Sequence, residues 1–233
     1  MASSRLWAVM PAAGSGRRMA AAQPKQYLSL GGTPVLQRSI DALLQLDRIE
    51  KVVVALAEDD QHWPSLEASR SDRVATTAGG AERSDSVVAG LRALAAEADR
   101  DDWVLVHDAA RPCLRRTDLE RLVESLADDP VGGLLAIPVA ETVKRADGES
   151  RVLETVPRES LWLAQTPQLF RYGLLLDALL AAQQRGEAVT DEAAAVEAYG
   201  SRPKLVAGDP GNIKITRPED LPLAERYLLQ EEN

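Results

Sequence analysis

A glycine-rich stretch near the start of the chain combines residue types that bind phosphate. It runs Pro11-Ala12-Ala13-Gly14-Ser15-Gly16-Arg17-Arg18-Met19, and Lys25 follows it. Glycines directly after a strand let the backbone wrap around a phosphate, with free amide groups pointing at it. Arginine and lysine beside these glycines supply the cationic donors that a polyphosphate needs. The stretch therefore indicates a polyphosphate site.

The same stretch is also compatible with a tight turn whose basic residues are solvated. It is not a Walker A loop, because no Gly-Lys-Ser/Thr follows it. It is not a dinucleotide-binding fingerprint either, because Met19 stands at the third glycine position. The choice between a phosphate site and a turn therefore depends on other residues.

A second group of polar residues, His107-Asp108-Ala109-Ala110-Arg111, directly follows an apolar run at 103–106. A carboxylate just past a strand end of an α/β sheet is well placed to hold Mg²⁺ against the phosphates of a nucleotide or to contact its ribose. On its own, Asp108 fits a turn or cap residue equally well. His107 fits either a general base or a buried, hydrogen-bonded structural histidine.

Two further polar segments lie next to predicted helices. Gly79-Gly80-Ala81-Glu82-Arg83-Ser84-Asp85-Ser86 precedes a long amphipathic pattern, and its plain interpretation is a loop with Ser84 as the N-cap. In Asn212-Ile213-Lys214-Ile215-Thr216, the lysine either reaches a substrate anion or is simply exposed.

The elements that must position these residues follow from the apolar pattern. Short runs rich in Val, Leu and Ile predict strands at residues 6–10, 52–57, 103–106, 134–137 and 204–206. Helical patterns lie at 35–45, 84–98, 119–127, 172–184, 191–199 and 219–229. Capping-box patterns, Thr117 with Glu120 and Thr216 with Glu219, mark two of the helix starts. The alternation predicts an α/β fold with a doubly wound, mainly parallel sheet that binds ligands at the carboxyl ends of its strands.

Residues 138–160 break this alternation. The segment is polar, and Asp147-Gly148 forms a hairpin-type turn between β-favouring pieces at 141–144 and 152–156. An arm of about 20 residues without a core of its own usually rests on its parent domain or on a second subunit. We therefore predict a single domain over residues 1–233 with a protruding β-arm at 138–160.

The composition excludes several classes of protein. The chain has 233 residues, of which 45% are apolar, and 27 basic against 36 acidic residues give a net charge of −9. These values fit one globular domain, and the acidic balance disfavours a general nucleic-acid binder. No apolar run approaches the ~18–20 residues of a membrane-spanning helix. Cys113 is the single cysteine and cannot form an internal disulfide, so we expect a cytoplasmic protein.

Taken together, the motifs resemble those of the 2-C-methyl-D-erythritol 4-phosphate cytidylyltransferases. Seven segments carry the resemblance in order along nearly the whole chain: Pro11-Ala12-Ala13-Gly14-x-Gly16-x-Arg18-Met19, Pro24-Lys25-Gln26-Tyr27, Gly79-Gly80-x-x-Arg83-x-x-Ser86-Val87, His107-Asp108-Ala109-Ala110-Arg111-Pro112, Thr166-Pro167-Gln168, Thr190-Asp191-Glu192 and Asn212-Ile213-Lys214-Ile215-Thr216. The resemblance implies a Rossmann-like nucleotidyltransferase fold. It also implies a reaction in which CTP and methylerythritol 4-phosphate give 4-diphosphocytidyl-2-C-methyl-D-erythritol and pyrophosphate.

The resemblance also implies roles for individual residues. Arg18 and Lys25 would hold the triphosphate and stabilise the transition state. Arg158 and Lys214 would position the methylerythritol phosphate, with help from Arg111 and Thr142. The residues expected to frame the nucleotide are Ala12, Ala13, Gly14, Gly16, Gly80 and Ser86, with Asp108 beside the ribose and the Mg²⁺ cofactor.

In this family, the arm that carries Thr142 and Arg158 exchanges between the subunits of a homodimer. The resemblance therefore implies that each active site is completed by its neighbour. One departure from the pattern is Ala81, where some relatives have an acidic residue able to contact the nucleotide. That departure puts one contact in doubt and leaves the expected reaction unchanged.

The expected chemistry bears on His107. The nucleophile is a phosphate monoester that is already largely dianionic at pH 7, because its second pKa is about 6. No general base is needed, so we interpret His107 as structural. Two rival functions use the same nucleotide loops: a cytidylyltransferase for another polyol phosphate, such as ribitol 5-phosphate, and a non-catalytic module that senses CTP.

Overall fold

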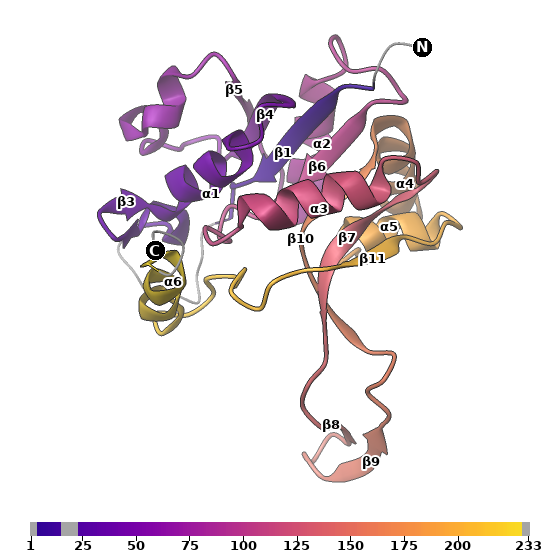
Figure 1. Ribbon diagram of the computed structural model, residues 1–233. Coiled ribbons are helices and arrows are strands. Elements are labelled where there is room, and N and C mark those ends of the chain that lie inside the picture. The colour runs from indigo at the N-terminus through magenta and orange to yellow at the C-terminus, as the bar shows by residue number, and fades with distance from the viewer. Residues whose placement is uncertain (1–3, 15–22, 230–233) are drawn as a thin grey trace.

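A seven-stranded sheet forms the centre of the protein, and a thin arm projects from one of its ends (Figure 1). The computed structural model describes residues 4–14 and 23–229. The strand order is β11 (Lys204–Ala207), β7 (Gly132–Pro138), β10 (Trp162–Arg171), β6 (Trp103–Val106), β1 (Leu6–Pro11), β4 (Ile49–Leu56) and β5 (Val74–Ala78). Only β10 runs antiparallel to its neighbours β6 and β7. The predicted mainly parallel α/β sheet is confirmed.

Helices cover both faces of this sheet, which explains why its strands are apolar without alternation. On one face, α1 (Val35–Leu44) and α3 (Arg116–Leu126) pack on strand side chains such as Ala8 and Leu105. On the other face, α2 (Arg83–Ala93), α4 (Tyr172–Arg185) and α5 (Glu192–Ala198) pack on side chains such as Val9 and Val104. The last helix, α6 (Asp220–Leu229), closes a smaller cluster around Ile215 and Cys113.

Several short elements complete the body. They are the 3₁₀ turns at Lys25–Tyr27, Trp63–Ser65 and Glu67–Arg70, and the two-residue strands β2 (Ser29–Leu30) and β3 (Thr33–Pro34). Across the described ranges, no helix combines the length and apolarity needed to span a membrane.

Two glycines shape the fold, one by allowing close packing and one by ending a helix. A Cβ at Gly90 of α2 would come within 2.4 Å of Cγ1 of Val9, so this glycine lets α2 lie close against β1. Gly186 ends α4 with φ at 66°, in the left-handed region that favours glycine after a helix.

Three helices, α2, α3 and α6, start within one to three residues of the predicted positions, but their caps differ from the patterns expected from the sequence. The helix α3 begins at Arg116, one residue before Thr117, and its cap position has no side-chain hydrogen bond. For α6, the Asp220 carboxylate, and not that of Glu219, accepts hydrogen bonds from the backbone N–H and the hydroxyl of Thr216. Ser84 lies inside α2, which is capped instead by a reciprocal pair of side chains, Glu82 and Asp85.

Two strands of the central sheet are not predicted by the apolar pattern. β5 reads Val-Ala-Thr-Thr-Ala and lies at the edge of the sheet, where polar side chains are tolerated. β10 carries Gln165, Thr166 and Pro167, and a proline within a run argues against a strand. Its pairing with β7 is irregular between Ala164 and Gln168, so the ladder accommodates the proline.

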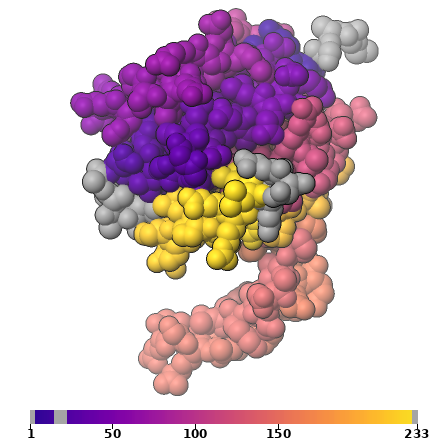
Figure 2. All heavy atoms as spheres, turned by 60° about the vertical axis from the view of Figure 1, so that its left-hand side comes forward, coloured from indigo at the N-terminus to yellow at the C-terminus, as the bar shows by residue number. Residues whose placement is uncertain are grey.

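The predicted arm is present. Its strands β8 (Val143–Ala146) and β9 (Val152–Val156) pair antiparallel, and Asp147 Oδ1 accepts backbone hydrogen bonds from Glu149 and Arg151 in the turn. The strand β8 begins two residues later than the predicted strand at 141–144. The hairpin extends well away from the body, as Figures 1 and 2 show.

Candidate active site

A pocket of about 340 Å³ opens where the loops after β1 and β6 lie side by side. Its lining combines the first glycine loop, the start of α2, the loop after β6 and the segment before α6. The predicted site residues that line it are Ala12, Ala13, Gly14, Lys25, Gly80, Ser86, Asp108 and Lys214. Gly16 and Arg18 lie outside the described residues.

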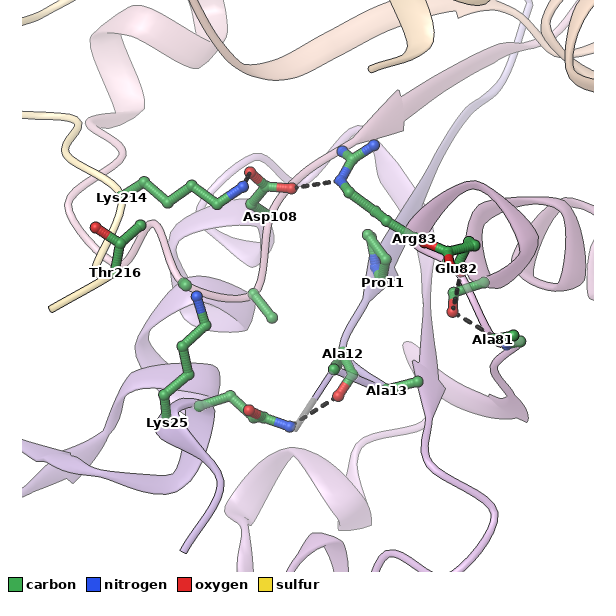
Figure 3. Close-up of a pocket in the computed structure, with 16 residues that line it drawn as sticks. Pro11, Ala12, Ala13, Lys25, Ala81, Glu82, Arg83, Asp108, Lys214 and Thr216 are labelled. Carbon is green, nitrogen blue, oxygen red and sulfur yellow. Dashed lines mark hydrogen bonds and ion pairs between the residues drawn. The ribbon is translucent and has the colours of Figure 1, made fainter. Parts of the chain in front are cut away.

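The loops on the side of this pocket formed by Ala12 and Gly80 are held tightly together. The backbone N–H of Ala12 donates to Ala55 O at 2.8 Å, and Gln26 Nε2 donates to Ala12 O at 2.8 Å (Figure 3). A Cβ at Gly79 would lie 2.5 Å from that of Ala13, so only glycine allows this approach. The hydroxyl of Ser86 accepts the N–H of Gly80 at 3.1 Å. Ser86 therefore shapes the Gly79-Gly80 loop.

Two lysines reach the pocket from opposite segments of the chain (Figure 3). Lys25 donates to the carbonyl of Ile215 at 3.0 Å. The backbone N–H of Ile215 donates to Ala110 O at 2.8 Å, which ties the segment carrying Lys214 to the loop after β6. Lys214 Nζ then lies 2.7 Å from Oδ2 of Asp108.

Asp108 is the centre of a cluster of cations. Arg83 Nε lies 2.9 Å from its Oδ1, Lys214 lies beside its Oδ2, and Arg111 Nε is 3.8 Å from Oδ2. Burial alone would raise the pKa of Asp108, but Arg83 and Lys214 outweigh burial and hold this pKa well below its ordinary range. The carboxylate is therefore ionised at neutral pH.

Arg83 also pairs with a second buried carboxylate. Its Nη1 and Nη2 donate to the two carboxylate oxygens of Glu192 at 2.6 and 3.0 Å. The Glu192 side chain is only 1% exposed. Burial raises the pKa of Glu192, and the Arg83 guanidinium opposes that rise. Neither Arg83 nor Glu192 is among the site residues predicted from the sequence, although both stand inside matched segments.

His107 is fully buried, and both of its ring nitrogens have partners. Nε2 lies 3.0 Å from the carbonyl of Arg111, which can only accept, so Nε2 carries the proton. Nδ1 then accepts from the hydroxyl of Thr166 at 3.1 Å, and the same hydroxyl accepts the backbone N–H of Asp108 at 3.0 Å. Burial lowers the pKa of His107 to about 4. These contacts support the structural interpretation, because His107 is neutral at pH 7 and lines neither of the two pockets formed by the described residues.

A second pocket of about 270 Å³ adjoins the first and shares Arg83, Asp108 and Lys214 with it. Arg111, predicted on the acceptor side, lines it and donates Nη1 to the carbonyl of Asn212 at 2.6 Å. No role is predicted from the sequence for its other polar residues, which are Gln165, Thr166, Gln168, Thr190 and Asp191. Asp108 and Lys214 therefore stand at the boundary between two cavities.

The structure does not bring Thr142 and Arg158 to either pocket. Both lie on the arm and are exposed, and Nη1 of Arg158 donates to the carbonyl of Ala140. Four large apolar side chains of the arm and its base are also exposed, namely Val152 (62%), Leu153 (63%), Trp162 (39%) and Leu163 (56%). The arm of a single chain thus leaves both polar and apolar side chains exposed.

The carboxylates of the described pocket fit a metal ion only if a bound ligand supplies most of the oxygen atoms around it. In the part of the chain that the structure describes, no three His, Cys, Asp or Glu side chains are grouped to hold one. Asp108 offers one ionised carboxylate at the pocket wall, and each carboxylate oxygen can accept more than one partner. Mg²⁺ commonly takes one or two carboxylates together with substrate phosphates. Asp108 therefore fits a magnesium ion held mainly by phosphate oxygens.

Comparisons with known proteins agree on one family. The model of the family IspD, described as 2-C-methyl-D-erythritol 4-phosphate cytidylyltransferase, matches residues 6–230. A protein of that name from Pseudomonas aeruginosa (strain UCBPP-PA14) is 56% identical over 216 residues, which is 92% of each chain. Another from Ectopseudomonas mendocina (strain ymp) is 54% identical over 94% of each chain.

Solved structures are similar over the same extent. A crystal structure of 4-diphosphocytidyl-2C-methyl-D-erythritol synthase is 37% identical with a TM-score of 0.84, covering 98% of this chain and 100% of the other. The 2-C-methyl-D-erythritol 4-phosphate cytidylyltransferase of Thermus thermophilus is 33% identical with a TM-score of 0.78, covering 95% and 98%.

Proposed function

The chain belongs to the 2-C-methyl-D-erythritol 4-phosphate cytidylyltransferase family and transfers the cytidylyl group of CTP to 2-C-methyl-D-erythritol 4-phosphate; on this premise we propose which residues do so. The observation that carries the assignment is the pair of adjoining pockets with Asp108 and Lys214 at their boundary. One pocket takes the nucleotide, and the other takes the acceptor. The α-phosphate of CTP then lies between them.

The chemistry of this reaction needs positive charge more than it needs a base. The attacking phosphate monoester is largely dianionic at pH 7. It attacks the α-phosphorus of CTP, a new P–O bond forms, and pyrophosphate leaves with the electrons of the broken P–O bond. Two contributions form the barrier. One is the repulsion between the two anionic substrates, and the other is the negative charge that develops in the transition state. Preorganised cations lower both.

Four cationic residues are proposed to lower this barrier. Lys25 and Arg18 hold the triphosphate and stabilise the transition state. Lys214 lies between the two pockets, where it contacts the phosphates of both substrates, and Arg111 binds the acceptor phosphate from the second pocket. The loops of Ala12, Ala13, Gly14, Gly16, Gly80 and Ser86 enclose the nucleoside.

Mg²⁺ belongs to the proposal as a cofactor. When bound, it would neutralise phosphate charge and favour departure of pyrophosphate. Asp108 is the residue that would hold it, since it is the ionised carboxylate at the boundary of the pockets.

A homodimer and a cytoplasmic location complete the proposal. Arg158 and Thr142 lie on an arm that projects from the body, and exposed Val152 and Leu153 give that arm an apolar surface. Packing of the arm against a second copy would bury this surface and bring both polar residues to the partner's acceptor pocket. Nucleic acid and membrane are not among the proposed partners.

The experiment is an assay of pyrophosphate release with CTP, Mg²⁺ and methylerythritol 4-phosphate, run beside ribitol 5-phosphate and other nucleoside triphosphates. Release that requires both CTP and methylerythritol 4-phosphate is the expected result. Release with ribitol 5-phosphate would move the acceptor assignment. CTP binding without release with any acceptor would point to a CTP sensor.

A further inference from the structure

Arg83 is the one side chain of the described α2 helix that lines both pockets. It is also the link between two buried carboxylates from distant segments, Asp108 after β6 and Glu192 at the start of α5. Figure 3 shows its guanidinium turned toward Asp108, away from the part of the pocket that Lys25 enters.

Each of the three guanidinium nitrogens of Arg83 donates to a carboxylate of the protein, which engages three of its five N–H donors. Nη1 and Nη2 both bind Glu192, and Nε binds Oδ1 of Asp108 at 2.9 Å. A bidentate pair fixes the plane of a guanidinium as well as its position. Arg83 is therefore held in place by two carboxylates of the protein before any substrate binds.

Glu192 is itself held rigidly. The backbone N–H groups of the two residues that follow it are satisfied, since Ala193 donates to Gln168 Oε1 at 2.8 Å and Ala194 donates to Asp191 Oδ1 at 2.9 Å. Gln168 also donates to Asp191 Oδ2 at 2.9 Å, which ties this turn to β10. Glu192 therefore anchors Arg83 to the sheet.

The anchored guanidinium determines how Asp108 presents its other oxygen. Nε of Arg83 donates to Oδ1 of Asp108. The other oxygen, Oδ2, is then directed at Lys214, whose ammonium nitrogen lies 2.7 Å away. A carboxylate without the Arg83 contact can rotate, and Lys214 then loses its fixed position.

We propose that Arg83, anchored by Glu192, is a positioning residue that orients the Asp108 carboxylate and, through it, the Lys214 ammonium at the boundary of the two pockets. Arg83 acts on the reaction without touching either substrate. The inference rests on the proposed role of Lys214 in the cytidylyl transfer.

The test compares Arg83→Lys, Arg83→Gln, Glu192→Gln and the double variant Arg83→Gln/Glu192→Gln. Each is assayed for kcat, for KM with both substrates and for Tm. Lysine at 83 keeps the charge, but a single ammonium cannot hold both carboxylates. We expect Arg83→Lys to fold with a Tm lowered less than that of Arg83→Gln, because the charge is kept, and to lower kcat about tenfold or more, in line with the loss of one hydrogen bond to a charged group.

The double variant separates positioning from simple charge pairing. Arg83→Gln leaves the buried Glu192 carboxylate without its cation and lowers Tm, whereas the double variant removes both charges and regains Tm. In Glu192→Gln, Arg83 keeps Asp108 as its partner but loses its anchor. Positioning predicts that the double variant still has a kcat reduced about tenfold or more and a KM for CTP within about threefold of wild type. Recovery of kcat together with Tm would overturn the proposal, and so would a raised KM for CTP with unchanged kcat.

A matched control is Asp177→Asn, which breaks the Arg100–Asp177 pair on the surface of α4, outside both pockets. It should retain wild-type kcat. If the wild-type protein releases no pyrophosphate, the proposed function is contradicted. If the wild-type protein and the Arg83 variants are all fully active, this inference alone is contradicted.

Discussion

The pocket wall and the arm are built on opposite physical principles. In the pocket wall, Asp108 and Glu192 are buried with cationic partners, and each loop is held by hydrogen bonds to a neighbouring strand or helix. In the arm, β8 and β9 pair with each other, and the side chains of Val152 and Leu153 are exposed.

The contrast shows how far folding of a single chain prepares the site. The body buries its apolar residues in layers on both faces of the sheet, so its charged groups are fixed before any ligand arrives. The arm buries almost nothing in a single chain. The two arm residues expected to bind the acceptor, Thr142 and Arg158, lie on this part, which the proposed second subunit would support.

The first prediction contrasts one apolar side chain from each region. Phe170→Ala removes a fully buried ring from β10 and should lower the free energy of unfolding by about 3–5 kcal/mol. Leu153→Ala removes a side chain that is 63% exposed and should change that free energy by less than about 0.5 kcal/mol when the protein is dilute enough to be monomeric. Urea denaturation of both variants checks the contrast, and a loss of several kcal/mol in the Leu153 variant would break it.

A second prediction addresses the preorganised charge of the body. Lys25→Ala should lower kcat by a factor of about 10² or more, because one donor to the transition state is lost. Its fold should remain intact, since Lys25 lies at the pocket surface. Steady-state turnover together with Tm measures both quantities. Near wild-type turnover would remove Lys25 from its assigned role.

A third prediction concerns pH and buried His107. Its pKa is about 4 in the folded protein and about 6.5 in the unfolded chain, so the unfolded chain binds the extra proton between these values. The stability that this histidine contributes is complete above pH 6.5 and is lost as the pH falls toward 4, a difference of about 3 kcal/mol. Unfolding curves at pH 7.5 and 4.5 should therefore differ less for His107→Gln than for wild type, and an equal difference would contradict the assignment.

A fourth prediction concerns substrate binding by the arm. Arg158→Ala removes one charge-assisted contact and should raise the KM for methylerythritol 4-phosphate about 10- to 100-fold. CTP binding should stay close to wild type, because no arm residue lines the described nucleotide pocket. Titration calorimetry with each substrate separates the two sites. An equal loss of affinity for both substrates would show that the arm is not specific to the acceptor.

The sequence alone predicts the sheet, most of its strands and the arm, because each depends on local patterns of apolar residues and turns. It misses β5 and β10. The glutamines of β10 find their partners far along the chain, Gln165 on the carbonyl of Asp209 and Gln168 on Asp191. The sequence also misses the pairing of Arg83 with Glu192. These residues stand 109 positions apart, and no local pattern records a contact at that separation.

Burial also decides the role of His107. The sequence leaves a base and a structural residue open until the chemistry of the phosphate nucleophile is considered. The structure adds the partners of both nitrogens, Arg111 and Thr166, which local sequence cannot supply.

A site divided between body and arm can be tested by mixing two impaired variants, Lys25→Ala and Arg158→Ala. A mixed dimer with exchanged arms contains one site with an intact body and an intact arm. After equal mixing and subunit exchange, half of the dimers are mixed, so we predict recovery of about a quarter of wild-type pyrophosphate release at a low concentration of methylerythritol 4-phosphate. Activity no higher than the average of the two separate variants would contradict the account, because it would mean that each arm serves its own subunit or neither.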